Sequence, residues 1–417
     1  MGYDFVVSGR IWSKGNFLDG EIAVKDGIIQ EVKPHINFIH KIDFGNKVIL
    51  PAGIDMHVHF REPGMTYKET IESGSISAIY GGLSTYVDMP NNVPPTSSID
   101  AIQDKLSIME KHSYADYGVY AFIGGKGVVK KLSVYVDAFK IYLAPSTGNI
   151  VLNNPEDLKE ISIELADSKK FCVVHAEDSA SFGPFKEHTL EGYSAYRSCQ
   201  SEKVAIEKIL SLYSDSFHIA HVSCPSNADL LKGKSFEVTP HHLLLNYNMP
   251  LGTFGKVNPP LRSEHDRDLL MEKFVNNEIP ILASDHAPHS LEDKDVPFDK
   301  APSGIPGVET TYPLFVNLAK KSKVPLEVLI NALCINPARK FGINGGLIEK
   351  SKEASFAVFD LHQAKTIKGK HLHGKSEWSP FEGFEAIFPT DVFIRGIHVI
   401  KNGFVNANHS GKRISKI

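Results

Sequence analysis

The sequence predicts an α/β protein, a (β/α)8 barrel with a small β-sandwich domain built from both chain ends. Between about residues 50 and 345, short apolar strand-like segments alternate with helical patterns, which implies βα units and a parallel sheet. The flanking segments have the short alternating pattern of antiparallel strands instead. A chain of 417 residues that is 42% hydrophobic can bury a large core and a smaller one.

The two chain ends share one sequence pattern, short alternating segments separated by turns. Segments 20–25 and 28–32 are separated by Lys25-Asp-Gly27, a hairpin signal, and similar alternating segments return at 354–360 and 391–403. We therefore expect residues 1–50 and 346–417 to pair into one composite β-domain, and residues 51–345 to form the barrel.

Eight strands are expected in the central region, at 48–58, 84–89, 117–123, 138–143, 171–175, 217–221, 235–239 and 279–284. Eight repeats in roughly 300 residues favour a (β/α)8 barrel over a doubly wound sheet, which usually has fewer strands. Two helix starts have clear signals: Thr66-x-x-Glu69 as a capping box, and Asn154-Pro155 as an N-cap followed by proline.

Residues that can bind metal follow the expected strands. His57 and His59 end the first strand two residues apart, so both imidazoles point the same way and form a chelating edge. A lone His-x-His is more often a surface or core pair than a metal site. Here, however, further strands end in Lys140, His175, His221 and Asp285. Barrel strands place their carboxyl ends at one face, where catalytic groups gather.

These residues can hold two metal ions. His57, His59 and Asp285 would bind one ion and His175 and His221 the other. Lys140 fits if its amine has captured carbon dioxide, because the resulting carbamate is anionic and can bridge two metals; a barrel-packing lysine remains the alternative. The metals would activate a bridging hydroxide and polarise a carbonyl, with Asp285 moving the proton. His241 and His242 are expected outside this set, as packing or supporting residues.

Composition excludes several classes of function. A net charge of −4 and the lack of a Lys/Arg block argue against nucleic-acid binding. The four cysteines form no CxxC pair, so we expect reduced thiols and no disulfide framework. No apolar stretch is long enough to span a membrane, and the N-terminus resembles no signal peptide, so a cytoplasmic location is expected.

Several longer motifs of the sequence resemble those of a known enzyme family. They are His57-Val-His-Phe-Arg-Glu-Pro-Gly64, Asp88-Met-Pro-Asn91, Phe139-Lys-Ile-Tyr-Leu143, Val174-His-Ala-Glu177, Val238-Thr-Pro-His-His-Leu243, Lys256-Val-Asn258 and Ala283-Ser-Asp-His-Ala-Pro-His289. In this order they resemble the dihydroorotases of the amidohydrolase superfamily. The resemblance runs from about residue 48 to Asn336-Pro-Ala-Arg339, and the flanking β-segments fit the family's composite second domain.

The resemblance implies the chemistry as well as the fold. It implies a zinc-dependent cyclic amidohydrolase with two Zn²⁺ ions per subunit, bridged by carboxylated Lys140, that reversibly cyclises N-carbamoyl-L-aspartate to L-dihydroorotate in pyrimidine biosynthesis. A metal-bound hydroxide would attack, with Asp285 as general acid and base. By motif position, the substrate would be held by Arg61, Asn91, Asn258, His289 and the 304–307 backbone, including Pro306 and Gly307.

The sequence also departs from the family pattern. Some relatives have Asp at the position of Lys140, and others have Arg at that of Asn258. The mobile substrate loop is matched poorly here, so that Thr147 is only a suggested contact. Allantoinase and dihydropyrimidinase share the metal cage, but their substrates lack the ring carboxylate that Arg61 would bind. A non-catalytic scaffold, docking to aspartate carbamoyltransferase and self-association stay open.

Overall fold

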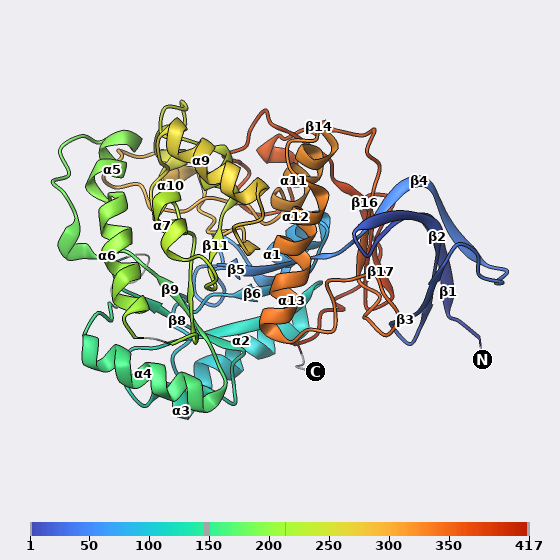
Figure 1. The fold of residues 1–417 in the computed structure, drawn as a ribbon, viewed down its shortest axis with the longest axis horizontal. Coiled ribbons are helices and arrows are strands. Elements are labelled where there is room, and N and C mark those ends of the chain that lie inside the picture. The colour runs from blue at the N-terminus through green and yellow to red at the C-terminus, as the bar shows by residue number, and fades with distance from the viewer. Residues whose placement is uncertain (1, 146–150, 213, 415–417) are drawn as a thin grey trace.

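The computed structural model describes residues 2–145, 151–212 and 214–414, and Figure 1 shows them in two parts. Parallel strands surrounded by helices make the larger part, and a sheet formed by both chain ends stands beside it. Within the described residues, no helix has both the length and the apolar character needed to cross a membrane.

The parallel strands form a closed ring. Strands β5 to β10 pair in sequence order, β11 pairs with β12, and the bridges Ile219–Phe236 and Val58–His286 join the two sets at both edges. All eight expected strands are confirmed, mostly with shorter bounds. The strands are β5 (Gly53–Val58), β6 (Leu83–Asp88), β7 (Asp116–Phe122), β8 (Ala138–Tyr142), β9 (Cys172–His175), β10 (Phe217–Ile219), β11 (Glu237–Val238) and β12 (Ile281–Leu282).

Helices cover the outside of this ring (Figure 1). Their apolar faces and the strands share one large buried cluster, which excludes water from the ring's outer surface. The α-helices are α1 (Ile71–Tyr80), α2 (Ile99–His112), α3 (Val128–Leu132), α4 (Pro155–Ser168), α5 (Leu190–Tyr196), α6 (Cys199–Leu210), α7 (Pro225–Leu230), α8 (Pro240–Leu244), α9 (Glu264–Val275), α10 (Leu291–Lys294), α11 (Thr311–Lys320), α12 (Leu326–Ile330) and α13 (Asn336–Phe341).

One of the two expected helix starts is confirmed and the other is wrong. Asn154 caps α4, its side chain accepting from Glu156 and Asp157, with Pro155 at the first helical position. Helix α1, in contrast, is capped by Thr70 with Ser73 as its reciprocal partner, and Thr66 plays no part. The Glu69 side chain instead bonds Ser73 Oγ and the backbone N–H of Lys375, because burial of a carboxylate requires such donors.

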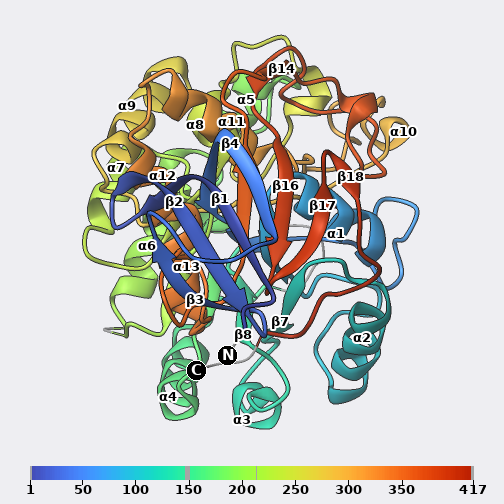
Figure 2. The ribbon, with the colours of Figure 1, turned by 90° about the vertical axis from the view of Figure 1, so that its right-hand side faces the viewer.

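The chain ends form one eight-stranded sheet, in the order β18, β17, β16, β13, β4, β1, β2, β3 (Figure 2). The N- and C-terminal segments meet where β13 pairs antiparallel with β4. The shared sheet is therefore as expected, although its hydrogen bonds join one continuous sheet and not two stacked ones. The strands are β1 (Phe5–Ser13), β2 (Asn16–Lys25), β3 (Ile28–Lys33), β4 (Lys41–Pro51), β13 (Phe356–Phe359), β16 (Pro389–Ile394), β17 (Ile397–Lys401) and β18 (Phe404–Val405).

Residues 48–51 were expected in the first barrel strand, and this is wrong. They end β4, which belongs to the terminal sheet, and the barrel strand begins at Gly53. Every residue from Val48 to Val58 is buried, because each of the two sheets buries its part of this mostly apolar stretch, so hydrophobicity alone cannot mark the break.

The expectation of four reduced cysteines is wrong for one pair. Cys199, which begins α6, and Cys224, which precedes α7, form a disulfide with their Cα atoms 5.8 Å apart. Cys172 and Cys334 are free and buried, as expected. The two bonded cysteines are 25 residues apart in sequence, and only the packing of α6 against α7 brings them together.

Candidate metal-binding active site

Side chains from the carboxyl ends of several barrel strands line one open cavity. His57 lies in β5 with His59 directly after it, Lys140 lies in β8 and His175 ends β9. The loops after β10 and β12 supply the rest. The structure thus brings together all six residues predicted to bind metal, namely His57, His59, Lys140, His175, His221 and Asp285.

The first predicted metal position is defined by one carboxylate oxygen. Oδ1 of Asp285 lies 3.3 Å from Nε2 of His57 and 3.2 Å from Nε2 of His59. One donor atom each from His57, His221 and Asp285 also lie within 4.8 Å of one another. Two imidazole nitrogens and a carboxylate oxygen are a ligand set that suits zinc.

The second predicted position has two imidazoles. Nδ1 of His175 lies 3.0 Å from Nε2 of His221, so the two nitrogens face the same point. Nδ1 of His221 has no hydrogen-bond partner among the described residues.

Burial sets the charge of these groups. Desolvation lowers the pKa of His59 to about 3 and that of His221 well below its ordinary value, the latter with help from His175. Burial alone would raise the pKa of Asp285, but the neighbouring imidazoles of His57, His59 and His221 hold it well below its usual range. Neutral imidazoles beside an ionised carboxylate are the forms that bind metal.

Lys140 is fully buried and its Nζ has no hydrogen-bond partner among the described residues. The nitrogen lies 5.2 Å from the ring centre of Tyr142. Burial lowers the pKa of Lys140 to about 8, although Glu237 and Asp285 act in the opposite direction. A buried amine without a hydrogen-bond partner lowers the stability of the folded protein. This position therefore fits a lysine that gains partners once its amine is modified or a metal is bound.

A buried carboxylate supports His57 from behind. Glu237 of β11 bonds Nδ1 of His57 through Oε1, and its Oε2 lies 3.1 Å from Nε2 of His218. This leaves Nε2 of His57 directed at the cavity. The sequence analysis did not predict a role for Glu237; its signal was a carboxylate between the apolar residues Phe236 and Val238 of an expected strand.

His175 has a similar support. Its Nε2 lies 2.8 Å from Oε2 of Glu177, and Arg197 binds both oxygens of that carboxylate. Both Glu177 and Arg197 were missed as functional residues. The signal for Glu177 was its position two residues after a ligand, but nothing in the sequence links Arg197 to it.

Arg61 and Asn91 line the same cavity, as predicted. The Arg61 side chain is buried and its Nε donates to the Pro288 carbonyl at 3.2 Å. Desolvation lowers the pKa of Arg61 to about 10, so it stays cationic at neutral pH. Oδ1 of Asn91 lies 2.5 Å from Nδ1 of His59, so Asn91 also orients a predicted metal ligand.

The other predicted substrate residues divide into two groups. Asn258 lines the cavity, and its Oδ1 accepts from the Tyr193 hydroxyl at 2.7 Å. His289 lies behind the cavity wall: its Nδ1 is 2.9 Å from Lys68 Nζ and its Nε2 is 3.1 Å from the Ser303 carbonyl. Desolvation, Arg61 and Lys68 place the pKa of His289 well below its ordinary value, so it is neutral.

The 304–307 backbone is only partly at the cavity. Ser303 and Gly304 line it, whereas Pro306 and Gly307 line a different, small cavity beside His286. Gly304 has a φ of 139°, and a Cβ there would meet the Ala287 carbonyl at 2.5 Å, so glycine is required. Thr147 lies outside the described residues, and His241 and His242 do not line the cavity.

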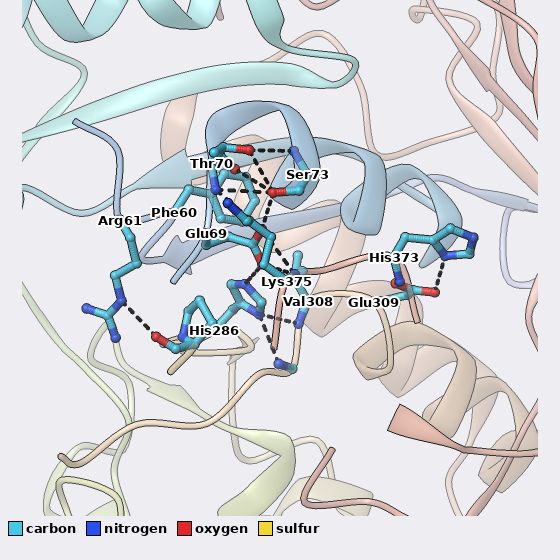
Figure 3. A network of polar contacts seen from close by, with 12 residues as sticks. Phe60, Arg61, Glu69, Thr70, Ser73, His286, Val308, Glu309, His373 and Lys375 are labelled. Atoms are coloured by element: carbon cyan, nitrogen blue, oxygen red, sulfur yellow. Dashed lines mark hydrogen bonds and ion pairs between the residues drawn. The ribbon is translucent and has the colours of Figure 1, made fainter. Parts of the chain in front are cut away.

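His286, the neighbour of Asp285, is fixed by a separate network (Figure 3). Its Nδ1 accepts from the backbone N–H of Gly307 at 3.0 Å and of Val308 at 3.3 Å, and its Nε2 lies 3.6 Å from Oε2 of Glu69. The His286 carbonyl accepts from the His59 N–H at 2.7 Å. The chain directly after Asp285 is therefore held in place.

Three cavity residues have backbone conformations that are rare for side chains larger than glycine. Arg61, His221 and Asp285 have φ angles of 56°, 38° and 47°. Such left-handed residues are strained and cluster at functional sites, where surrounding structure holds them. The sharp turn at each strand end directs these side chains into the cavity.

Known proteins are similar in sequence to this chain over almost its whole length. A family model described as Dihydro-orotase-like matches residues 46–117. A dihydroorotase of Archaeoglobus fulgidus is 37% identical over 98% of this chain and 100% of its own. One of Thermoplasma acidophilum is 40% identical over 96% of this chain and 95% of its own. The chain belongs to the dihydroorotase family.

Solved structures agree with this family's fold. An L-hydantoinase (dihydropyrimidinase) from Arthrobacter aurescens covers 100% of both chains with a TM-score of 0.92 and 26% identity. A D-hydantoinase (dihydropyrimidinase) from Thermus sp. covers 98% of both with a TM-score of 0.87, and at 21% identity it shows the fold alone. This chain thus shares its architecture with these two hydantoinases.

Proposed function

We propose that the protein is a dihydroorotase, which reversibly cyclises N-carbamoyl-L-aspartate to L-dihydroorotate in pyrimidine biosynthesis. The observation that carries the proposal is the buried guanidinium of Arg61 at the edge of the cavity that His57, His59, His175, His221 and Asp285 line. A buried cation beside a metal site calls for an anionic substrate group, and the carboxylate of dihydroorotate supplies one.

The donor set fits two zinc ions. His57, His59 and Asp285 would hold one, His175 and His221 the other, and Lys140 as its carbamate would join them. The unpaired Nζ of Lys140 and Nδ1 of His221 support this assignment, because both are buried polar atoms without a partner among the described residues. When bound, the metals polarise the scissile carbonyl and lower the pKa of water.

Asp285 moves the proton. In hydrolysis, its carboxylate takes a proton from the attacking water and delivers it to the ring nitrogen as the amide bond breaks. Cyclisation runs these transfers backwards: the nitrogen of the carbamoyl group loses its proton to Asp285 as it attacks the side-chain carboxyl group. Asp285 passes that proton to the departing oxygen, and a second proton taken up from solvent by the carboxylate lets this oxygen leave as water. The position of the Asp285 Oδ1, 3.2 Å from His59, suits a carboxylate that both binds metal and exchanges protons.

The substrate carboxylate would lie against Arg61. Asn91 can add a hydrogen bond from its Nδ2, since its Oδ1 is used by His59. Asn258 and the Gly304 backbone would contact the ring or its amides. Both ring nitrogens of His289 already have protein partners, so we propose that His289 positions Arg61 and does not bind the substrate itself. A guanidinium nitrogen of Arg61 lies 3.4 Å from Nε2 of His289.

A hydantoinase or dihydropyrimidinase is the second candidate, favoured by the shared fold and the 26% identity to the L-hydantoinase. The test gives the zinc-loaded protein dihydroorotate, hydantoin, dihydrouracil and allantoin side by side. We expect turnover of dihydroorotate, with poor or no turnover of the neutral rings, which would leave Arg61 unpaired. Preference for a neutral ring would reject the dihydroorotase proposal while keeping the metal site.

The organisation of the chain adds further proposals. The eight-stranded terminal sheet has its own apolar cluster, which supports a composite domain of residues 1–50 and 346–417 beside a barrel of residues 51–345. Docking to aspartate carbamoyltransferase and self-association stay predictions, and size measurements of the protein with and without that enzyme would test them.

A further inference from the structure

Outside the active-site cavity, three exposed side chains form a second cluster of metal-binding type. They are Glu72 in the first turn of α1, His112 at the end of α2, and His409 in the C-terminal segment that follows β18. One donor atom from each lies within 4.8 Å of the others. From this arrangement we propose a zinc site that fastens the C-terminal segment to the barrel.

The ligand types and their geometry suit the ion. Two imidazoles and one carboxylate are a three-ligand set that zinc accepts, with water in the fourth position. Nε2 of His409 already lies 3.4 Å from Oε1 of Glu72, close to the spacing of two ligands on one zinc ion. The rings of His112 and His409 are 5.8 Å apart and cross at 76°. All three side chains are exposed, so small rotations can complete the approach.

The C-terminal segment is held beside α2 independently of any ion. The Gly411 N–H donates to the Ser113 carbonyl at 3.0 Å, and the Ser410 hydroxyl donates to the Tyr114 carbonyl at 3.4 Å. A Cβ at Gly411 would meet the Ala115 carbonyl at 2.1 Å, so the two backbones approach closely. The ring of His409 also packs on Tyr114, with centroids 4.7 Å apart. These contacts place His409 near His112 before zinc arrives.

The site joins parts of the chain that are distant in sequence. Figure 2 shows the segment after β18 running down the side of the molecule on which α1 and α2 lie. A zinc ion on Glu72, His112 and His409 would tie that segment to both helices. Its role would be structural, because the three residues lie outside the active-site lining.

The experiment counts zinc. Protein with its active site loaded is equilibrated with zinc chloride at micromolar free metal, and bound zinc is measured per chain for wild type, E72Q, H112Q and H409Q. We expect wild type to hold one more zinc than each variant. H265Q, which changes an exposed histidine on α9, should keep the wild-type count. Hydrolysis of dihydroorotate should be equal in all five proteins.

Affinity and stability give two further readouts. By calorimetric titration, H409Q should bind the extra zinc more than about tenfold more weakly, since even loss of a residue behind a ligand costs about that much. Zinc should also slow protease cleavage after residue 405 in wild type and not in H409Q. Equal zinc counts in wild type and the three variants would overturn the proposal and leave His409 and Glu72 as a simple surface ion pair.

Discussion

The guanidinium of Arg197 binds both oxygens of the Glu177 carboxylate, with 3.0 Å from Nε to Oε1 and 2.5 Å from the terminal nitrogen to Oε2. Glu177 in turn lies 2.8 Å from Nε2 of His175. This chain of contacts fixes which ring nitrogen of His175 faces the cavity. Glu177 is completely buried, which by itself would raise its pKa, but Arg197 and His175 together hold the pKa of Glu177 well below its ordinary value.

Arg197→Lys should weaken metal binding without removing a ligand. Lysine keeps the charge but cannot bind both carboxylate oxygens, so Glu177 and His175 gain freedom. We expect zinc affinity at the second metal position to fall by about 10- to 100-fold, measured by competition with a chelator. Arg395→Lys is the matched control, because Arg395 also binds both oxygens of one carboxylate, that of Asp116, and neither residue lines the cavity. Equal zinc affinity in wild type and Arg197→Lys would contradict the role assigned to Arg197.

Lys140→Ala tests the bridging carbamate. The variant should hold less zinc and lose nearly all activity, because it lacks the anionic group that would join the two ions. A small carboxylic acid that fits the vacated space should restore part of the activity. The prediction fails if a crystal structure of the active wild type shows both metals beside an unmodified amine.

Arg61→Met tests the recognition of the substrate carboxylate. Removing one partner of a buried charged pair costs on the order of 2 to 5 kcal/mol, so kcat/KM for dihydroorotate should fall about 30-fold to several thousand-fold. Zinc content should not change, because Arg61 supplies no predicted ligand. Wild-type efficiency in this variant would remove the basis of the substrate assignment.

His242 should make stability depend on pH. Burial lowers its pKa from 6.5 to about 4, opposed by its hydrogen bond to the Pro259 carbonyl. As the pH falls below 6.5, His242 becomes protonated in the unfolded chain but stays neutral in the folded protein until about pH 4. This group's contribution to the free energy of unfolding should therefore fall by up to about 3 kcal/mol across that window.

The measurement is the stability of the metal-free protein between pH 7 and 4. In His242→Gln the loss of stability over that range should be smaller than in wild type, whereas His265→Gln, at an exposed position, should match wild type. A parallel decline in wild type and His242→Gln would show that other groups cause the acid sensitivity.

The disulfide can be tested by counting thiols. Alkylation of the unfolded protein without reductant should label two cysteines, Cys172 and Cys334, and prior reduction should raise the count to four. Because Cys199 and Cys224 close a loop of moderate length, Cys199→Ser should lower the free energy of unfolding by about 3 kcal/mol. Four free thiols without reductant would contradict the disulfide and support the sequence-based prediction that all four cysteines are reduced.

The sequence by itself determined the barrel and most of the candidate site. Apolar strand segments recur between helical ones, and strands that run parallel must end at one face. Residues at those ends, such as His57, His175 and Asp285, could therefore be assigned to one site without coordinates. The pairing of the chain ends followed for a similar reason, because their alternating pattern requires a partner sheet.

Only the tertiary structure decided which residues support that site. Glu237 behind His57, Arg197 behind Glu177, and Cys199 with Cys224 are contacts between segments far apart in sequence, and no local period encodes such distances. The same holds for the break between β4 and β5 within one apolar run. Local patterns fix how a strand or helix orients its own side chains, whereas the partner that each buried polar group meets depends on how the finished elements pack.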